Sequence, residues 1–287
     1  MTTILVTGAS GTVGSNVVRR LMERGAPVRA LVRDAKKAVA ALGNDVELVL
    51  GDFGDPATIE AALKGVDRVF LSCPNDPRQV DYERNVIDGV ARAGVQRLVK
   101  LSANGARLGS PLEFWDWHAR IEQHLDGAGV PAVVLRPNFY MTNILASAEA
   151  IKHTGQLFLP AADASVAMVD PRDVAAAAVA ALDGAGDDGA RYLLTGPEPI
   201  TFASVAEAVG SAAGYDVQFV SVPDVAARGA MAEAGLPPFI ADNLIRLFGF
   251  LRQGTQEGTT DDVHTLTGRP PASFAQFATD YAWAFSR

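Results

Sequence analysis

Residues 6–14 read Val-Thr-Gly-Ala-Ser-Gly-Thr-Val-Gly and join a short apolar run to an amphipathic stretch. In such a loop Gly8 makes a tight turn, Gly11 lets the backbone approach a diphosphate, and Gly14 lets the helix lie close on the sheet. The helix that follows offers free N–H groups and partial positive charge to phosphates. No lysine follows the last glycine, so the loop is not of the Walker type. It predicts a dinucleotide site, and a purely structural turn is the alternative.

Short apolar runs alternate with amphipathic stretches through the first half of the chain. Strands are predicted at 3–7, 28–32, 46–50, 67–72, 97–102 and 132–136, and helices at 12–23, 56–63, 78–93 and 113–126. Strands that are apolar on both faces and separated by helices are typical of a parallel sheet covered on both sides. The predicted fold class is α/β, with a Rossmann-type doubly wound parallel sheet.

The rhythm changes after residue 137. Helices are predicted at 139–152, 171–182, 201–213 and 223–233, and short strands at 157–159, 191–195 and 217–221, with prolines between them. We therefore predict a dinucleotide-binding part at 1–137. A smaller α+β substrate region at 138–287 is expected to cover the ligand end of the sheet, the two parts being interleaved in one compact unit.

Composition restricts the classes of function. The 287 residues include 25 Lys and Arg against 33 Asp and Glu, for a net charge of −8. This balance lacks the basic footprint of a general nucleic-acid binder or of a protein held on an anionic membrane. Cys73 is the single cysteine, and no targeting segment is visible, so we expect a cytoplasmic protein. The four histidines are scattered, so no metal site is predicted.

The end of the second predicted strand selects the cofactor. Arg33 lies about 20 residues beyond the glycine loop, where an acidic residue would hold the ribose 2′-hydroxyl of NAD. A guanidinium suits a 2′-phosphate instead, and Lys36 and Lys37 follow closely. The residues favour NADP(H). A solvated basic strand end and a rescue of NAD binding by Asp34 are the alternatives.

The sequence resembles the short-chain dehydrogenase/reductase superfamily, specifically its atypical NmrA-like branch, over nearly the whole chain. The stretches that carry the resemblance are 7–14, 31–34, 51–53, 135–137, 169–174 and 267–271. The resemblance implies a Rossmann-type NADP(H) domain with a small C-terminal substrate region. It also implies that residues 72–74 run beside the adenosine ribose and that residues 137–140 close over one side of the nicotinamide.

The resemblance further implies individual contacts. Asp52 and Phe53 would meet the adenine, and Lys100 and Ser102 would end the strand beneath the nicotinamide. Together with the glycine loop, the residues predicted to contact the cofactor are Gly8, Ser10, Gly11, Thr12, Val13, Gly14, Arg33, Asp52, Phe53, Ser72, Cys73, Lys100, Pro137 and Phe139. Trp115, Tyr140 and Asn143 are the predicted substrate contacts.

The chain departs from the superfamily at the catalytic pair. That pair is Tyr-x-x-x-Lys, and no tyrosine in this sequence has a lysine four positions later. In the related isoflavone-reductase-like enzymes a catalytic lysine begins the stretch that ends in a Gly-Ile/Val-Pro turn. Counting back from residues 129–131, His118 occupies that place. The resemblance therefore implies a catalytic role for His118.

Two other interpretations remain open for these polar residues. His118 shares a helix face with Ile121 and Leu125, so a buried core histidine is the alternative to a proton donor. Ser102 is the second catalytic candidate, as a hydrogen-bond partner of the substrate, or else a polar strand end. Asp116 is a weaker candidate, because acids at helix N-termini often serve the helix dipole.

Aromatic and apolar side chains gather near the expected pocket and suit a planar substrate. They are Trp115, Trp117, Phe139, Tyr140, Met141, Phe158, Phe239, Phe248 and Phe250. We predict an NADPH-dependent oxidoreductase that reduces a carbonyl, enone or quinone of an apolar, aromatic small molecule. The alternative is an NADP(H)-binding redox sensor without turnover, which the missing tyrosine favours. Epimerisation of a sugar nucleotide is weakened for the same reason, and the oligomeric state stays open.

Overall fold

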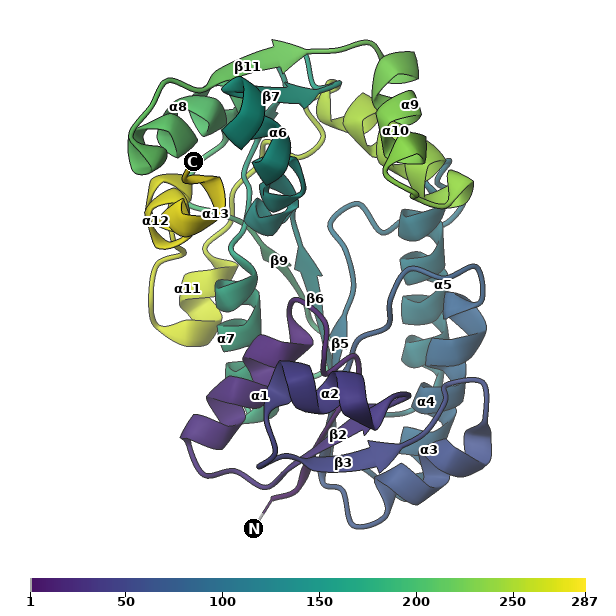
Figure 1. Cartoon of the computed structure of the whole chain (residues 1–287). Coiled ribbons are helices and arrows are strands. Elements are labelled where there is room, and N and C mark those ends of the chain that lie inside the picture. The colour runs from purple at the N-terminus through teal and green to yellow at the C-terminus, as the bar shows by residue number, and fades with distance from the viewer. Residues whose placement is uncertain (1) are drawn as a thin grey trace.

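Seven parallel strands form the central sheet of the computed structural model, which describes residues 2–287 (Figure 1). Their spatial order is β3-β2-β1-β4-β5-β6-β9. The strands are β1 (Ile4–Val6), β2 (Val28–Val32), β3 (Glu47–Leu50), β4 (Arg68–Leu71), β5 (Arg97–Leu101), β6 (Ala132–Pro137) and β9 (Arg191–Leu194). The order reverses between β1 and β4, where doubly wound sheets bind their ligands. The predicted α/β class and the doubly wound parallel sheet are confirmed.

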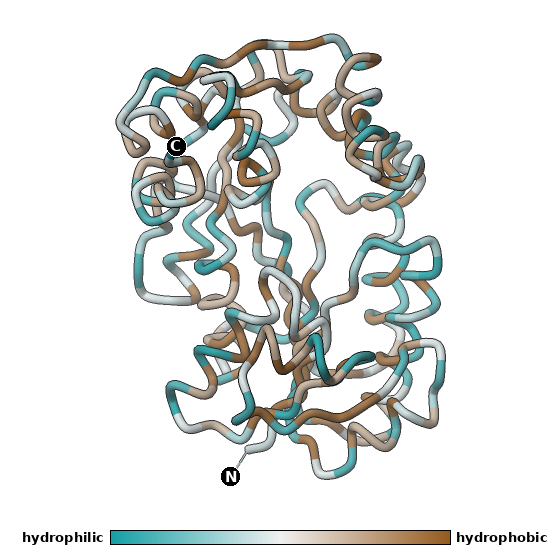
Figure 2. The backbone as a smooth tube through the Cα atoms, in the orientation of Figure 1, coloured by the Kyte–Doolittle hydropathy of each residue, from teal (hydrophilic) through white to brown (hydrophobic). Residues whose placement is uncertain are grey.

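Helices cover both faces of this sheet (Figure 1). One face carries α1 (Gly14–Glu23) and α7 (Pro171–Leu182), and α11 (Asp262–Thr267) packs beside α7. The other carries α3 (Pro56–Leu63), α4 (Gln79–Ala93) and α5 (Glu113–Gly127). Because side chains alternate along each strand, the sheet divides two apolar cores, and hydrophobic colours follow its strands in Figure 2.

The remaining elements build a smaller layer above the ligand end of the sheet (Figure 1). Its helices are η1 (Met141–Ser147, a 3₁₀ helix), α6 (Ala148–Thr154), α8 (Phe202–Ala213), α9 (Asp224–Glu233), α10 (Pro238–Leu251), α12 (Phe274–Asp280) and α13 (Ala282–Phe285). Two small sheets pair β7 (Gln156–Leu159) with β11 (Gln218–Ser221) and β8 (Ser165–Val166) with β10 (Ile200–Thr201). A third apolar core around Phe202 and Phe277 holds this layer together.

Two segments of the second half return to the central sheet. The strand predicted at 191–195 is β9, which pairs with β6 as the seventh strand, and α7 packs against α1. The single helix predicted over 139–152 is wrong in its first part. Phe139 and Tyr140 are held extended, because Val169 donates its N–H to the Phe139 carbonyl and accepts the Met141 N–H. The chain then forms η1 before α6 begins.

Two helices of at least eight residues lie where no helix was predicted. The helix α2 (Ala35–Leu42) begins directly after Asp34, whose carboxylate accepts the N–H groups of Lys36 at 2.9 Å and Lys37 at 3.1 Å. An acid before an alanine-rich run is a recognised helix start, so a sequence signal for α2 existed. The other is α10, which begins at the second of two consecutive prolines, a residue type that suits the first helical turn.

Candidate functional site

A cleft of about 1090 Å³ opens at the carboxyl ends of the central strands. Its walls come from the β1–α1 loop, the ends of β2, β4, β5 and β6, the start of α5 and parts of the upper layer. Pockets for drug-sized ligands usually measure roughly 300–1,000 Å³. The cleft is therefore large enough for a long cofactor together with a substrate.

The glycine loop at one end of the cleft tolerates no larger residue at two of its positions. Gly8 has φ +57°, and a Cβ there would lie 2.8 Å from the Ser72 carbonyl oxygen. A Cβ on Gly14 would lie only 2.2 Å from the Gly8 carbonyl oxygen. The expected close approach at Gly14 is thus between the first turn of α1 and the loop itself rather than between helix and sheet. This packing folds residues 8–14 into a tight loop, which we call the glycine cradle.

The cradle leaves the start of α1 free for an anion. Val13 occupies the N-cap position, no side chain caps the helix, and its first turn holds no acidic residue. Thr7 fixes the neighbouring strand end, since its hydroxyl donates to the Ser72 carbonyl at 3.0 Å and accepts the Ser72 N–H at 2.9 Å. Unpaired N–H groups and the helix dipole together suit a diphosphate. These residues fit a dinucleotide.

Positive charge stands at the end of β2. Arg33 and Lys37 both line the cleft and are exposed, and within residues 2–287 neither forms an ion pair. The carboxylate of Asp34 is already engaged as the cap of α2. The acid that a ribose 2′-hydroxyl would need is therefore occupied, while two cations remain free for a phosphate.

The wall beyond β3 and β4 is aromatic and polar. The Phe53 ring meets Tyr82 edge to face at 6.3 Å between centroids, and the Asn85 side chain donates to the Phe53 carbonyl at 2.8 Å. Asp52 accepts the Gly54 N–H at 2.7 Å, which orders the same turn. Burial, followed by the charge of Glu83, raises the pKa of the Cys73 thiol, so Cys73 stays protonated in the cleft.

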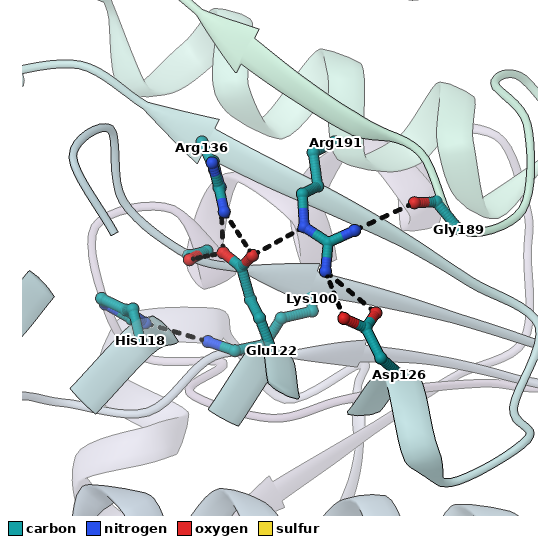
Figure 3. A network of polar contacts seen from close by, with 8 residues as sticks. Lys100, His118, Glu122, Asp126, Arg136, Gly189 and Arg191 are labelled. Carbon is teal, nitrogen blue, oxygen red and sulfur yellow. Dashed lines mark hydrogen bonds and ion pairs between the residues drawn. The ribbon is translucent and has the colours of Figure 1, made fainter. Parts of the chain in front are cut away.

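A buried cation, Lys100, lies beside His118, the histidine that lines the cleft (Figure 3). Lys100, in β5, is fully buried, and its Nζ lies 3.2 Å from Nδ1 of His118 and 2.7 Å from Oε2 of Glu83. His118 is half-buried and lines the cleft. Burial and the positive charges of Lys100 and Arg136 hold the pKa of His118 well below its ordinary value. The imidazole is therefore neutral near pH 7.

A second polar network, one helical turn further along α5, holds this part of the helix against the sheet (Figure 3). Glu122 accepts hydrogen bonds from Ser102 at 2.5 Å, from Arg136 at 2.6 Å and from Arg191 at 2.8 Å. Burial raises the pKa of Glu122, but these hydrogen bonds outweigh it and the net shift is downward. The carboxylate thus stays charged, and it accepts the hydrogen bond that the Ser102 hydroxyl donates. Ser102 can still accept a hydrogen bond from a ligand.

Aromatic side chains line the opposite end of the cleft. Trp115 stacks obliquely on Phe250 with 4.8 Å between ring centroids, and a Cβ on Gly105 would meet the Trp115 ring at 2.5 Å. Phe139 packs edge to face on Phe202 at 6.1 Å. Burial raises the pKa of Tyr140, so its hydroxyl remains neutral. This end of the cleft offers flat apolar surfaces.

The cleft brings together most of the residues that the sequence singled out. Every predicted cofactor contact except Gly14 and Lys100 lines it, as do His118, Ser102, Trp115, Tyr140 and Asn143. Gly14 lies behind the loop, and Lys100 lies beneath the cleft wall. From the aromatic set, the residues that do not line it are Trp117, Met141, Phe158, Phe239, Phe248 and Phe250.

Sequence reasoning missed other members of the cleft. Asn104 lies just after β5, and Leu247 and Gln256 come from the upper layer. A polar residue directly after a parallel strand was a usable signal for Asn104, whereas no local pattern marked Leu247 or Gln256. Among residues 2–287, no three His, Cys, Asp or Glu side chains gather as a metal site would require. No helix in that range is long and apolar enough to cross a membrane.

Comparison with known proteins places this architecture in a family. The model of the NmrA-like family matches residues 1–266. An NAD(P)H azoreductase of Xenophilus azovorans is 38% identical over 282 residues, covering 98% of this chain and 99% of the relative. A (4-alkanoyl-5-oxo-2,5-dihydrofuran-3-yl)methyl phosphate reductase of Streptomyces griseus is 40% identical over 284 residues, covering 99% of each protein.

A solved structure also matches this chain over nearly its whole length. The NADPH-dependent quinone oxidoreductase of Escherichia coli, in complex with NADPH, superimposes with a TM-score of 0.86. The two are 30% identical in sequence, and the match covers 96% of this chain and 99% of the other. The family model and the full-length relatives agree, and the chain belongs to the NmrA-like family.

Proposed function

We infer that the protein is an NADPH-dependent reductase of an apolar small molecule. One observation carries this inference: a glycine cradle, two free cations and an aromatic wall with a half-buried histidine line a single cleft. Full-length relatives named as an azoreductase and as a (4-alkanoyl-5-oxo-2,5-dihydrofuran-3-yl)methyl phosphate reductase support it, as does a neighbour named as a quinone oxidoreductase. Bound NADPH supplies the hydride.

We propose that the cofactor lies along the cleft from the end of β2 to the end of β5. Arg33 and Lys37 would bind the 2′-phosphate, and the cradle with the free start of α1 would bind the diphosphate. Phe53 would meet the adenine, with Ser72 and Cys73 beside its ribose. Pro137 and Phe139 would then flank the nicotinamide end.

We propose His118 as the residue that supplies a proton to the substrate oxygen. Reduction of a carbonyl leaves negative charge on that oxygen, and the charge needs a donor. The neutral imidazole of His118 lines the cleft and carries one N–H. Ser102, whose hydroxyl donates its hydrogen bond to Glu122, would accept a hydrogen bond and so orient a substrate or an ordered water.

The substrate end of the cleft favours an uncharged aromatic acceptor. Arg33 and Lys37 are the only Lys or Arg side chains in its wall among residues 2–287, and both stand at the other end. Trp115, Tyr140 and Phe139 offer flat faces, and Asn143 offers an amide. A quinone, enone or aryl ketone fits these groups, whereas a phosphorylated acceptor finds no cation there.

Turnover separates a reductase from a sensor. Purified protein is incubated with NADPH and a panel of quinones, enones and aryl ketones, each with and without a phosphate group, and NADPH oxidation is followed by absorbance. We expect turnover with the uncharged acceptors. NADPH binding without turnover of any acceptor would support the sensor instead. We also propose a cytoplasmic location, which the single cysteine supports.

The charge at the end of β2 predicts a preference for NADPH over NADH. A charge-assisted hydrogen bond contributes about 1.5–3 kcal/mol, which corresponds to roughly ten- to a hundredfold in affinity. Arg33→Ala should therefore weaken NADPH binding by that factor while leaving NADH binding nearly unchanged, as measured by calorimetry. Lys36→Ala is the matched control, because Lys36 does not line the cleft. Equal affinities of the native protein for the two cofactors would contradict the assignment.

A further inference from the structure

Lys100 is a buried ammonium with a complete set of partners. It is fully buried and is the only Lys or Arg among the buried polar residues of the part described. Its Nζ donates to the carbonyl of Leu101 and to Nδ1 of His118, and forms an ion pair with Glu83. Such a pair is costly to bury, and apolar side chains of similar size often stabilise a core as well or better. Stability alone therefore gives no reason for a lysine here.

Glu83 is the counter-charge that this cation needs. The Glu83 carboxylate is also fully buried, and its Oε1 accepts a hydrogen bond from Gln79 at 2.9 Å. Burial raises the pKa of Glu83, and the adjacent Lys100 and the Gln79 amide offset that rise only in part. The ion pair with Glu83 compensates the positive charge of Lys100 in an apolar core. An uncharged amine at this position could accept a hydrogen bond from Nδ1 of His118 as well as donate one.

The ammonium dictates where the proton of His118 resides. An ammonium has no lone pair, so Nδ1 must accept, and the proton of a neutral imidazole is then on Nε2. Nε2 of His118 makes no hydrogen bond within residues 2–287 and is not among the buried polar atoms that lack a partner. It is therefore open to the cleft that His118 lines. The cations that act on the ring are Lys100 on β5 and Arg136 on β6, and each is paired with a buried acid, Glu83 on α4 and Glu122 on α5.

We propose that Lys100, held by Glu83, is a positioning residue that makes His118 a neutral acid. The proposal rests on the function proposed above. Donation into Nδ1 keeps the ring proton on Nε2 and withdraws electron density from the ring, so the Nε2–H group is a stronger donor. A carboxylate bound to Nδ1, as in serine proteases, has the opposite effect and stabilises the imidazolium.

His118 and Lys100 supply the protons for the reduction, and water restores them only after the product has left. As the substrate oxygen takes the proton, its O–H bond forms and the Nε2–H bond of His118 breaks. A proton passes from Nζ of Lys100 to Nδ1, so the ring stays neutral and Lys100 becomes an amine beside Glu83. After the product leaves, water protonates Nε2, and the proton on Nδ1 returns to Lys100.

The first test uses the native protein without cofactor or substrate. Histidine is labelled with ¹⁵N, and long-range ¹H–¹⁵N spectra are recorded between about pH 5.5 and 8.5. His118→Gln assigns the signal among the four histidines. We expect a neutral ring with its proton on Nε2 throughout this range. A proton on Nδ1, or an ordinary histidine titration, would overturn the proposal without any assay of activity.

The second test removes the charges together. In Lys100→Met/Glu83→Gln, no buried charge is left without its partner, and loss of the nearest cation should raise the pKa of His118. We expect kcat for a ketone to fall at least about tenfold, with NADPH affinity unchanged. Lys100→Arg keeps a cation that can only donate, so the Nε2–H tautomer should persist there.

The outcomes separate this proposal from the proposed function. If no acceptor is reduced but His118 has the expected tautomer, the reductase fails and the structural assignment of Lys100 stands. If the native protein reduces ketones and the double variant matches it in kcat and in His118 titration, the role of Lys100 is wrong. Should the double variant fail to fold, the spectra of the native protein and of Lys100→Arg still decide.

Discussion

Gly14→Val should abolish dinucleotide binding while the chain stays folded. A Cβ at this position would lie 2.2 Å from the Gly8 carbonyl oxygen and 3.0 Å from the Cα of Ala9. These atoms belong to the backbone of the cradle, so no side-chain rotation relieves the clash. The loop and the start of α1 must separate, and the free N–H groups then lose their common target. Calorimetric titration with NADPH measures the loss, which we expect to exceed a hundredfold.

A matched valine elsewhere separates binding from helix propensity. Gly229 lies inside α9, is exposed, and a Cβ there meets nothing within 4 Å. Gly229→Val should therefore bind NADPH like the native protein. Circular dichroism and thermal unfolding establish that both variants are folded. Native-like affinity in a folded Gly14→Val protein would mean that the loop is a structural turn and not a cofactor cradle.

The sequence predicted most of the sheet because its five inner strands are buried on both faces. Such strands form continuous apolar runs, and the glycines after the helices mark their ends. Gly25, Gly65 and Gly94 indeed have φ values of +69°, +71° and +64°. The seventh strand was misassigned to the upper layer. The residues of a short strand do not indicate which strand it pairs with. The chain between β6 and β9 passes through the upper layer before β9 pairs with β6.

The sequence predicted those parts of the candidate site whose residues are close together in the chain. It did not predict the contacts between residues that are far apart in the chain. The cradle and Arg33 lie in or beside one βα unit, so their spacing indicated their place. Lys100 was expected beneath the nicotinamide, yet it turns toward α4 and α5, where Glu83 and His118 meet it. Glu83 lies 17 residues before it in a helix predicted only by its periodicity, and no pattern distinguishes a buried acid there from an exposed one.

His118→Ala should lower kcat for a ketone by at least about a hundredfold, the lower range for loss of general acid catalysis. NADPH affinity should change little, because His118 stands at the substrate end, apart from the glycine cradle and Arg33. A quinone needs less help from an acid, so we expect a smaller loss with quinones. Steady-state rates with both acceptor classes, together with a cofactor titration, measure the difference.

The pH profile of the native enzyme tests the same residue independently. An imidazolium donor would lose its proton as the pH rises through about 6.5, and the rate would fall. Because the pKa of His118 is held well below that value, the group is neutral on both sides of it, and the rate with ketones should stay level from about pH 6 to 8. A fall across that range that disappears in His118→Ala would contradict a neutral donor.

The control for His118→Ala lies on the same helix. His124, in the last turn of α5, pairs with Asp88 at 2.7 Å and does not line the cleft. His124→Ala should keep native kcat with every acceptor, although it also removes an imidazole from α5. Thermal unfolding of both variants separates lost chemistry from lost packing. If His118→Ala is as active as His124→Ala with ketones, enones and quinones alike, His118 is a core histidine whose hydrogen bond to Lys100 serves packing alone.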